Sequence, residues 1–290
     1  MRLGTRQPWS ARAARQAWRV LDGTLAWAPA LLLLAPLVML GIGAFSTTWD
    51  SNGPRGFSLQ PFRTAWTFSA RSAGFSVLMA TSVAMMSTML AIPIAYFLLR
   101  SEPWLRRTLG ALVFLPAVLP SLLYAMGLIM ALPGLHGGWG LLFLAYAAQA
   151  LPFAVWPVLA GLQLLDIALL EKAGQTLGAS RWQRLMWLIV PNALRPAAVG
   201  VVSVFVLVLA ESSTSFFLAS GQYQPFGVTL YNAFQDLDVR IAAASTMMLI
   251  AILAPAVLAM ELWLARRVVR PVQDRAAALP DFAQAQRALS

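Results

Sequence analysis

Six apolar stretches dominate this chain, and each is long enough to cross a lipid bilayer as a helix. They cover residues 24–46, 73–99, 108–131, 139–163, 197–219 and 241–264. A helix rises about 1.5 Å per residue, so crossing about 30 Å of hydrocarbon takes about 20 residues. Each stretch exceeds that length. The sequence therefore predicts an all-α, polytopic membrane protein with six transmembrane helices.

Composition favours the bilayer over water as the solvent of this chain. Hydrophobic residues make up 59% of it and charged residues only 11%, whereas a soluble domain carries about 25% charged residues. The first apolar stretch is too long for the core of a signal peptide, and no clear A-x-A cleavage site follows it. We therefore expect it to be a retained span.

Side chains that commonly carry catalysis are scarce. The chain has no cysteine, and His136 is its one histidine. This composition excludes thiolate and histidine-cluster metal sites and the usual Ser/His or Cys/His catalytic arrangements. A Walker A loop needs a lysine directly after its last glycine, but the one lysine, Lys172, follows Glu171. We expect no catalytic residue, no metal and no cofactor, and any ATPase that drives this protein to be a separate subunit.

Basic residues are distributed unequally between the two sides that six spans define. One side holds Arg2, Arg6, Arg12, Arg15, Arg19, Arg100, Arg106, Arg107, Lys172, Arg181, Arg184, Arg195, Arg266, Arg267, Arg270, Arg275 and Arg287. The other holds only Arg55, Arg63, Arg71 and Arg240. Basic residues concentrate on the cytoplasmic side of membrane proteins, so we expect both termini and the 164–195 loop to be cytoplasmic. The net charge of +10 is largely this bias.

The same reasoning divides the chain into three parts. Residues 1–23 form a cytoplasmic basic segment, expected to lie on anionic lipid headgroups. Nucleic-acid binding is the alternative for such a basic run, and the adjoining span disfavours it. Residues 24–264 form the transmembrane domain with its cytoplasmic loop at 164–195, and residues 265–290 form a cytoplasmic tail.

The central loop carries a polar, helix-prone segment, EKAGQTLGASRWQRLMWLIVP, between two apolar spans. Gly178 interrupts the segment, and glycine permits a sharp turn. Pro191 is expected to end it before the next span. A helix–glycine–helix element at a membrane surface is suited to being held by a partner protein.

Particular side chains of this segment fit a docking surface. Trp182 and Leu185 are the expected apolar anchors, and Arg181 and Arg184 are expected at the rim. The alternative is that Trp182 lies in the belt of aromatic residues at the lipid headgroups.

The segment resembles the EAA loop of type I ABC-importer permeases, the MetI-like family. The matching residues are Ala173, Gly178, Ala179, Ser180, Trp182, Leu188, Val190 and Pro191. In that family the loop forms a short coupling helix that docks into a groove on the ATP-hydrolysing subunit, and nucleotide-driven closure of the subunit pair switches the permease between inward-open and outward-open states. The resemblance implies docking residues at Glu171, Lys172, Ala173, Gly178, Ala179, Ser180, Arg181, Trp182, Arg184, Leu185 and Pro191.

Two positions depart from the family pattern. The family's Glu-Ala-Ala falls on Lys172, Ala173 and Gly174, so a lysine stands where an acid is expected. Glu171 lies one position early and is the candidate for the role of that acid. Glycine at position 174 weakens a helix by about 1 kcal/mol relative to alanine.

Glu211 is an acidic residue inside the predicted fifth span. An isolated carboxylate in hydrocarbon costs at least ~2.5 kcal/mol, so it must face the bundle interior or water. Ser212, Ser213 and Thr214 extend the polar run. We expect this face either to line the translocation pathway as a gate or to hold helices together through hydrogen bonds, and the sequence leaves both open.

The resemblance implies a permease subunit of an ATP-driven, binding-protein-dependent importer in a bacterial inner membrane, working by alternating access. It implies a pair of ATP-binding subunits, a second permease, identical or paralogous, and a periplasmic or lipoprotein solute-binding protein. The stretch SGQYQPFGVTLYNAFQDLDVRIAAAS is similar to the branch that handles polyamines, iron(III), phosphonates or thiamine. An ATPase-independent secondary transporter is the alternative; it predicts inverted repeats and several buried charges, and neither feature is evident.

Overall fold

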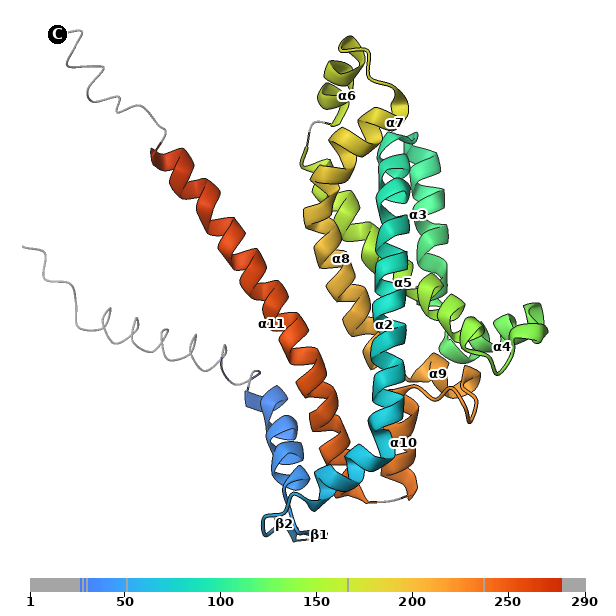
Figure 1. The fold of residues 1–290 in the computed structure, drawn as a ribbon, viewed down its shortest axis with the longest axis vertical. Coiled ribbons are helices and arrows are strands. Elements are labelled where there is room, and N and C mark those ends of the chain that lie inside the picture. The colour runs from blue at the N-terminus through green and yellow to red at the C-terminus, as the bar shows by residue number, and fades with distance from the viewer. Residues whose placement is uncertain are drawn as a thin grey trace, which may run out of the picture. The chain divides into compact units, whose positions relative to one another are not determined.

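The computed structural model describes residues 27, 29, 31–50, 52–165, 167–236 and 238–277, with the backbone alone at 168, 236 and 263–277. The described chain is helical apart from one short hairpin and the connecting turns (Figure 1). This confirms the predicted all-α class. The predicted interfacial segment 1–23 and the end of the predicted tail, 278–290, lie outside the described residues.

The chain divides into two units. The first unit comprises Met1–Phe68 and Ala233–Met247, and the second comprises Ser69–Asn232 and Met248–Ser290. Three helices pass from one unit into the other, namely α2 (Gln60–Arg100), α10 (Phe226–Asp236) and α11 (Val239–Ala277).

The first unit contains an apolar helix, Leu31–Ala44, followed by a hairpin. Strand β1 (Thr48–Asp50) pairs antiparallel with β2 (Gly53–Arg55), with Trp49 opposite Pro54. The Trp49 ring lies against Gly43, where an added Cβ would come within 1.7 Å of the ring. Glycine at position 43 is therefore what allows the hairpin to fold back onto the helix.

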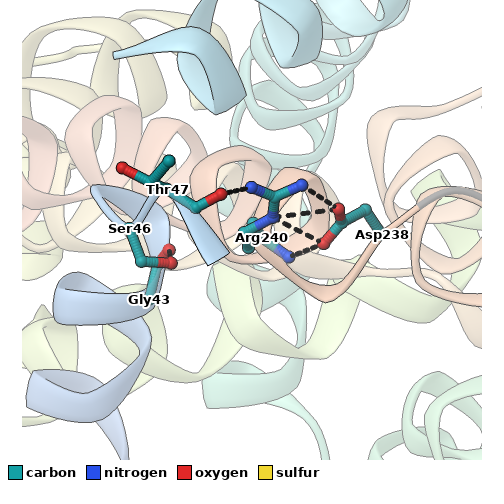
Figure 2. A network of polar contacts seen from close by, with 5 residues as sticks. All are labelled: Gly43, Ser46, Thr47, Asp238 and Arg240. Atoms are coloured by element: carbon teal, nitrogen blue, oxygen red, sulfur yellow. Dashed lines mark hydrogen bonds and ion pairs between the residues drawn. The ribbon is translucent and has the colours of Figure 1, made fainter. Parts of the chain in front are cut away.

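An arginine joins the start of α11 to this hairpin (Figure 2). The Arg240 guanidinium pairs with the Asp238 carboxylate, with 2.5 Å between Nη2 and Oδ2, and Nη1 donates to the carbonyl oxygen of Thr47. Donation from the Arg240 side chain holds the pKa of the Asp238 carboxyl below its ordinary value. The Asp238 charge is thus neutralised within the chain.

In the second unit, α5 (Trp139–Gln163) is the central helix of the core, because twelve of its residues are buried. It packs against α8 (Val190–Ala210) and α3 (Pro103–Val118). Small residues bring α5 and α8 close together: a Cβ on Gly200 would lie 3.2 Å from the Ala154 backbone, and a Cβ on Gly161 would lie 2.5 Å from the Pro196 ring. Close approach through small residues is typical of helix packing in membranes.

The predicted span 139–163 coincides with α5, and the predicted spans 73–99 and 241–264 lie within α2 and α11. Helix α11 continues to Ala277, so residue 264 is not a helix end. Within the described ranges, four helices are long and apolar enough to cross a membrane, and helix Leu31–Ala44 is apolar but shorter.

The predicted span 108–131 is not one straight helix. Helices α3 and α4 (Ser121–Ala131) meet at an angle of 101°. Proline disfavours helical backbone in the residue before it, and Leu119, directly before Pro120, is extended at φ −63°, ψ 137°. The two helices form a bent pair, the arrangement of a broken span or a re-entrant loop, and a short 3-10 turn, η1 (Pro133–Leu135), follows it.

The predicted span 197–219 is displaced toward the N-terminus. Helical backbone runs without interruption from Arg181 to Ala210, through α7 (Arg181–Arg184), the π-helical turn η2 (Leu185–Ile189) and α8. It ends at Glu211, and the short helix α9 (Ser213–Leu218) follows as a separate element. The prediction of a single helix through Glu211 is therefore wrong.

Candidate functional site

The central loop is a helix–turn–helix whose turn is defined by glycine. Helix α6 (Ile167–Thr176) ends in a Schellman motif: Ala179 N donates to Gly174 O, and Gly178 N donates to Gln175 O, both at 2.9 Å. Gly178 has φ +75°, a conformation that side chains disfavour. The predicted sharp turn at Gly178 is confirmed.

A capping box starts the second half of the loop. Gln183 N donates to Ser180 Oγ at 3.2 Å, and Ser180 N donates to Gln183 Oε1 at 2.7 Å. These reciprocal bonds satisfy backbone donors that α7 would otherwise leave free at its start. Both sides of the turn are therefore fixed by local hydrogen bonds.

Pro191 does not end the loop segment, contrary to the sequence prediction. It occupies the first turn of α8, and the preceding turn is π-helical, with Val190 N donating to Leu185 O. A wider π turn is one of the local adjustments that accommodate a proline, which lacks an N–H group. The second half of the loop is consequently continuous with the transmembrane helix α8.

Glu171 lies inside the protein rather than on the loop surface, with only 7% of it exposed. Its Oε1 accepts from Arg100 Nη1 at 2.9 Å and from the Tyr96 hydroxyl. Arg100 also donates to the Tyr96 hydroxyl at 2.8 Å. This cluster connects α6 to the end of α2, whereas the neighbouring Lys172 is exposed.

Arg184 is not at a rim, as the sequence predicts, but buried, with 7% exposed. Its Nη1 donates to Ala179 O at 2.5 Å, and Gly174 makes room for it: a Cβ at position 174 would lie 3.1 Å from Arg184 Cδ and 3.0 Å from Leu188 Cδ1. The departure from the family's alanine at Gly174 therefore has a packing reason.

The exposed surface of the loop is centred on two apolar side chains. Leu177 is 86% exposed and Trp182 is 65% exposed. Lys172, Ala173, Ser180, Arg181 and Pro191 are exposed as well, while Ala179 and Leu185 are half-buried and Leu185 packs against the core. The sequence prediction missed Leu177; the signal for it was an apolar residue directly before the glycine that ends α6.

The break after α8 forms a second polar site. Glu211 Oε1 accepts from the backbone N of Thr214 at 2.8 Å, and Ser215 Oγ donates to Glu211 O at 3.0 Å. The carboxylate thus satisfies a backbone donor at the start of α9. Gln149 and Tyr146 of α5, which the sequence prediction missed, bind Thr214 and Ser215 respectively.

A cavity of about 320 Å³ adjoins this break. Ser212 and Ser213 line it together with Phe216, Phe217 and Tyr231, whereas Thr214 is fully buried against α5. Helix α10 approaches closely at Gly227, where a Cβ would lie 2.8 Å from Ser212 Cβ. Within the described part of the chain, no three His, Asp or Glu side chains come together as a metal site.

Four helices long and apolar enough to cross a membrane, within the described ranges, define a multi-pass membrane protein. Residues 87–270 match the family described as binding-protein-dependent transport system inner membrane component. The chain belongs to this family and is a permease of the inner membrane. Membership favours binding-protein-dependent transport over the secondary transporter that the sequence left as an alternative.

Similar proteins of known role include two bacterial permeases. The spermidine/putrescine transport system permease protein PotC of Escherichia coli (strain K12) is 25% identical over 242 residues, which cover 80% of this chain and 89% of PotC. The molybdenum transport system permease protein ModB of Haemophilus influenzae is 28% identical over 211 residues, which cover 67% of this chain and 92% of ModB.

Solved structures share the fold. A bacterial ABC transporter involved in the import of the acidic polysaccharide alginate superimposes with a TM-score of 0.68 at 16% identity, covering 91% of this chain and all of its own. The alginate transporter in complex with an alginate pentasaccharide-bound periplasmic protein gives the same TM-score at 17% identity, covering 89% of this chain and 98% of its own. The predicted permease fold is confirmed.

Proposed function

We propose that this chain is one transmembrane half of an ATP-driven importer whose ATP hydrolysis takes place in a separate subunit, and that the 164–195 loop docks on that subunit. The observation that carries the proposal is the turn at Gly178. It presents Leu177 and Trp182 to solvent while hydrogen bonds fix both flanking helices. A rigid element with a central aromatic anchor is what a stable docking interface requires.

Two structural connections would transmit a displacement of this loop to the transmembrane helices. The buried Glu171–Arg100 pair attaches α6 to the end of α2. The continuous helix from Arg181 to Ala210 attaches the other half of the loop to the break at Glu211. A displacement of the loop would therefore reach both α2 and the Glu211 region, which supports alternating access driven by the ATPase.

The proposed assembly contains two permeases, two ATP-binding subunits and a solute-binding protein. Each chain offers one such loop, so a pair of ATP-binding subunits needs two permeases, identical or paralogous. The bias in basic residues supports cytoplasmic termini and a cytoplasmic loop. The three-part division into residues 1–23, 24–264 and 265–290 is part of this proposal.

The proposed cargo is a small solute of the polyamine, iron(III), phosphonate or thiamine kind, with polyamines first. The Glu211 carboxylate accepts a backbone N–H from Thr214, and no ion pair of the described residues includes it. A half-buried anion beside a cavity lined by Ser212 and Ser213 favours a cation in the pathway. Similarity to PotC points the same way.

Co-purification of the detergent-solubilised permease with its cognate ATP-binding subunit tests the docking proposal. Trp182→Ala should weaken retention by about 2 kcal/mol or more, as truncation of a central aromatic does. Trp139→Ala is the matched control, because Trp139 lies at the start of α5, outside the 164–195 loop, and is 56% exposed. Equal retention by both variants, or no retention by the wild type, would contradict the proposal.

A further inference from the structure

A second cavity, of about 440 Å³, lies between the start of α3 and the end of α5, and its lining includes neither Glu211 nor a residue of the 164–195 loop. Two adjacent arginines, Arg106 and Arg107, and the amide of Gln163 line it together with apolar side chains. Phe114 and Trp156 are the aromatic members of the lining, and their rings meet edge to face with centroids 4.9 Å apart.

The polar and apolar parts of this lining occupy different depths along the helices. Arg106 and Arg107 lie in the first turns of α3, and Gln163 is the last residue of α5. Phe114 and Trp156 lie about two turns further from those helix ends, which is about 10 Å at 1.5 Å per residue. The cavity is therefore polar at the membrane surface and apolar toward the membrane interior.

The two arginines are available for a ligand. Both are exposed, and among the described residues neither takes part in an ion pair. Arg100 and Arg240, by contrast, are paired with carboxylates. Gly110 lies in the wall between the arginines and Phe114, and an added Cβ there would meet no atom within 4 Å.

We propose that this cavity binds one anionic phospholipid, with its phosphate on Arg106 and Arg107 and an acyl chain along Phe114 and Trp156. Arginine donates charge-assisted hydrogen bonds to phosphate oxygens, and basic pockets between transmembrane helices bind lipid headgroups. A free phosphate ion would engage the arginines but leave the aromatic end of the cavity empty. A phospholipid matches both ends.

Native mass spectrometry of the full-length chain, purified in mild detergent, tests this site. We expect one phosphatidylglycerol to remain bound, with at least tenfold preference over phosphatidylcholine with the same acyl chains. The double variant Arg106→Gln/Arg107→Gln should lose this preference. The matched double variant Arg71→Gln/Arg195→Gln removes the same charge from two exposed arginines outside the cavity, and it should keep the preference.

Gly110→Leu tests whether the lipid needs the shape of the cavity or only the two positive charges. It fills open space in the wall while both arginines remain, so we expect the chain to keep its melting temperature and lose the bound lipid. Several results would overturn the proposal. These are equal losses in both double variants, displacement of the lipid by millimolar inorganic phosphate, or a wild type that retains no lipid.

Discussion

Glu171 and Arg100, 71 residues apart in the chain, form an ion pair with 2.9 Å between Oε1 and Nη1. The Glu171 side chain is 9% exposed and the Arg100 side chain 47%. Glu171 is therefore buried in the protein, and Arg100 contacts it from the surface. Together with the Tyr96 hydroxyl, the pair links the central loop to α2.

Arg100→Gln should loosen α6. It leaves the Glu171 carboxylate with the Tyr96 hydroxyl as its remaining partner, and an under-satisfied buried acceptor costs about 1–3 kcal/mol. Amide hydrogen exchange in residues 167–176 should therefore become about tenfold faster or more, because about 1.4 kcal/mol corresponds to a factor of ten.

Lys172→Gln is the control for this experiment, since it changes the exposed neighbour on the same helix. It should leave exchange in α6 unchanged. Adding Glu171→Gln to Arg100→Gln should produce less than the sum of the two single effects, as expected for residues in contact. Fully additive effects would show that the pair does not hold α6.

Gly174→Leu should destabilise the protein by about 1–3 kcal/mol, the usual cost of overpacking. A side chain at this position meets Arg184 and Leu188 at 3.0–3.2 Å from its first atom. Gly110→Leu is the matched substitution, because it is also buried in a helix but has open space around it. Thermal unfolding in detergent should show a lower melting temperature for Gly174→Leu and not for Gly110→Leu. Equal melting temperatures of the two variants would contradict the packing argument.

Much of the loop could be predicted from the sequence because its determinants are local. Gly178 and Ser180 act through backbone conformation and short-range hydrogen bonds, and both are recognisable by spacing. The burial of Glu171 and Arg184 could not be predicted in this way, because their partners are a distant helix and a glycine that makes room.

The spans show the same division between local and long-range causes. Helix α5 coincides with its apolar stretch, but hydropathy does not register where a helix breaks inside an apolar run. The chain bends between α3 and α4 at Pro120, and the next break, at Glu211, is held by bonds to α9 and α5. Helical backbone continues through Pro191 because the turn before it is π-helical. The spacing of residues in the sequence does not predict a π-helical turn.

Glu211→Gln separates a role in transport from a role in structure. Glutamine keeps an oxygen that can accept from Thr214 N, so the start of α9 and the melting temperature should be preserved. Glu211→Ala removes that acceptor and should also destabilise by about 1 kcal/mol. If the charge serves a cationic solute, both variants should lower spermidine uptake about tenfold in proteoliposomes containing the whole transporter. Wild-type uptake by Glu211→Gln would leave only the structural role.

The Asp238–Arg240 pair predicts an acid-dependent loss of stability. Arg240 lowers the pKa of the Asp238 carboxyl from its ordinary 3.8. The folded state therefore binds the proton less tightly than the unfolded state. The stabilisation is complete above pH 3.8 and disappears as pH falls through the lowered pKa. A pair this close to the surface contributes at most about 1 kcal/mol.

Melting temperatures of wild type and Asp238→Asn across this pH range measure that contribution. The difference between them should be largest near neutral pH and vanish in acid. If the difference in melting temperature between wild type and Asp238→Asn did not change with pH, the substitution would act through something other than the charge of Asp238.

The most direct test of the account is cross-linking from the turn of the loop. The chain has no cysteine, so Leu177→Cys introduces its one thiol, at an 86% exposed position directly before the turn at Gly178. Phe57→Cys is the control, placed at a 75% exposed apolar side chain close to Arg55, on the side that the bias in basic residues predicts to lie opposite the cytoplasm. In the assembled transporter, a short bifunctional reagent should join position 177, and not position 57, to the ATP-binding subunit. Cross-linking from position 57 alone, or equally from both, would contradict a docking role for the loop.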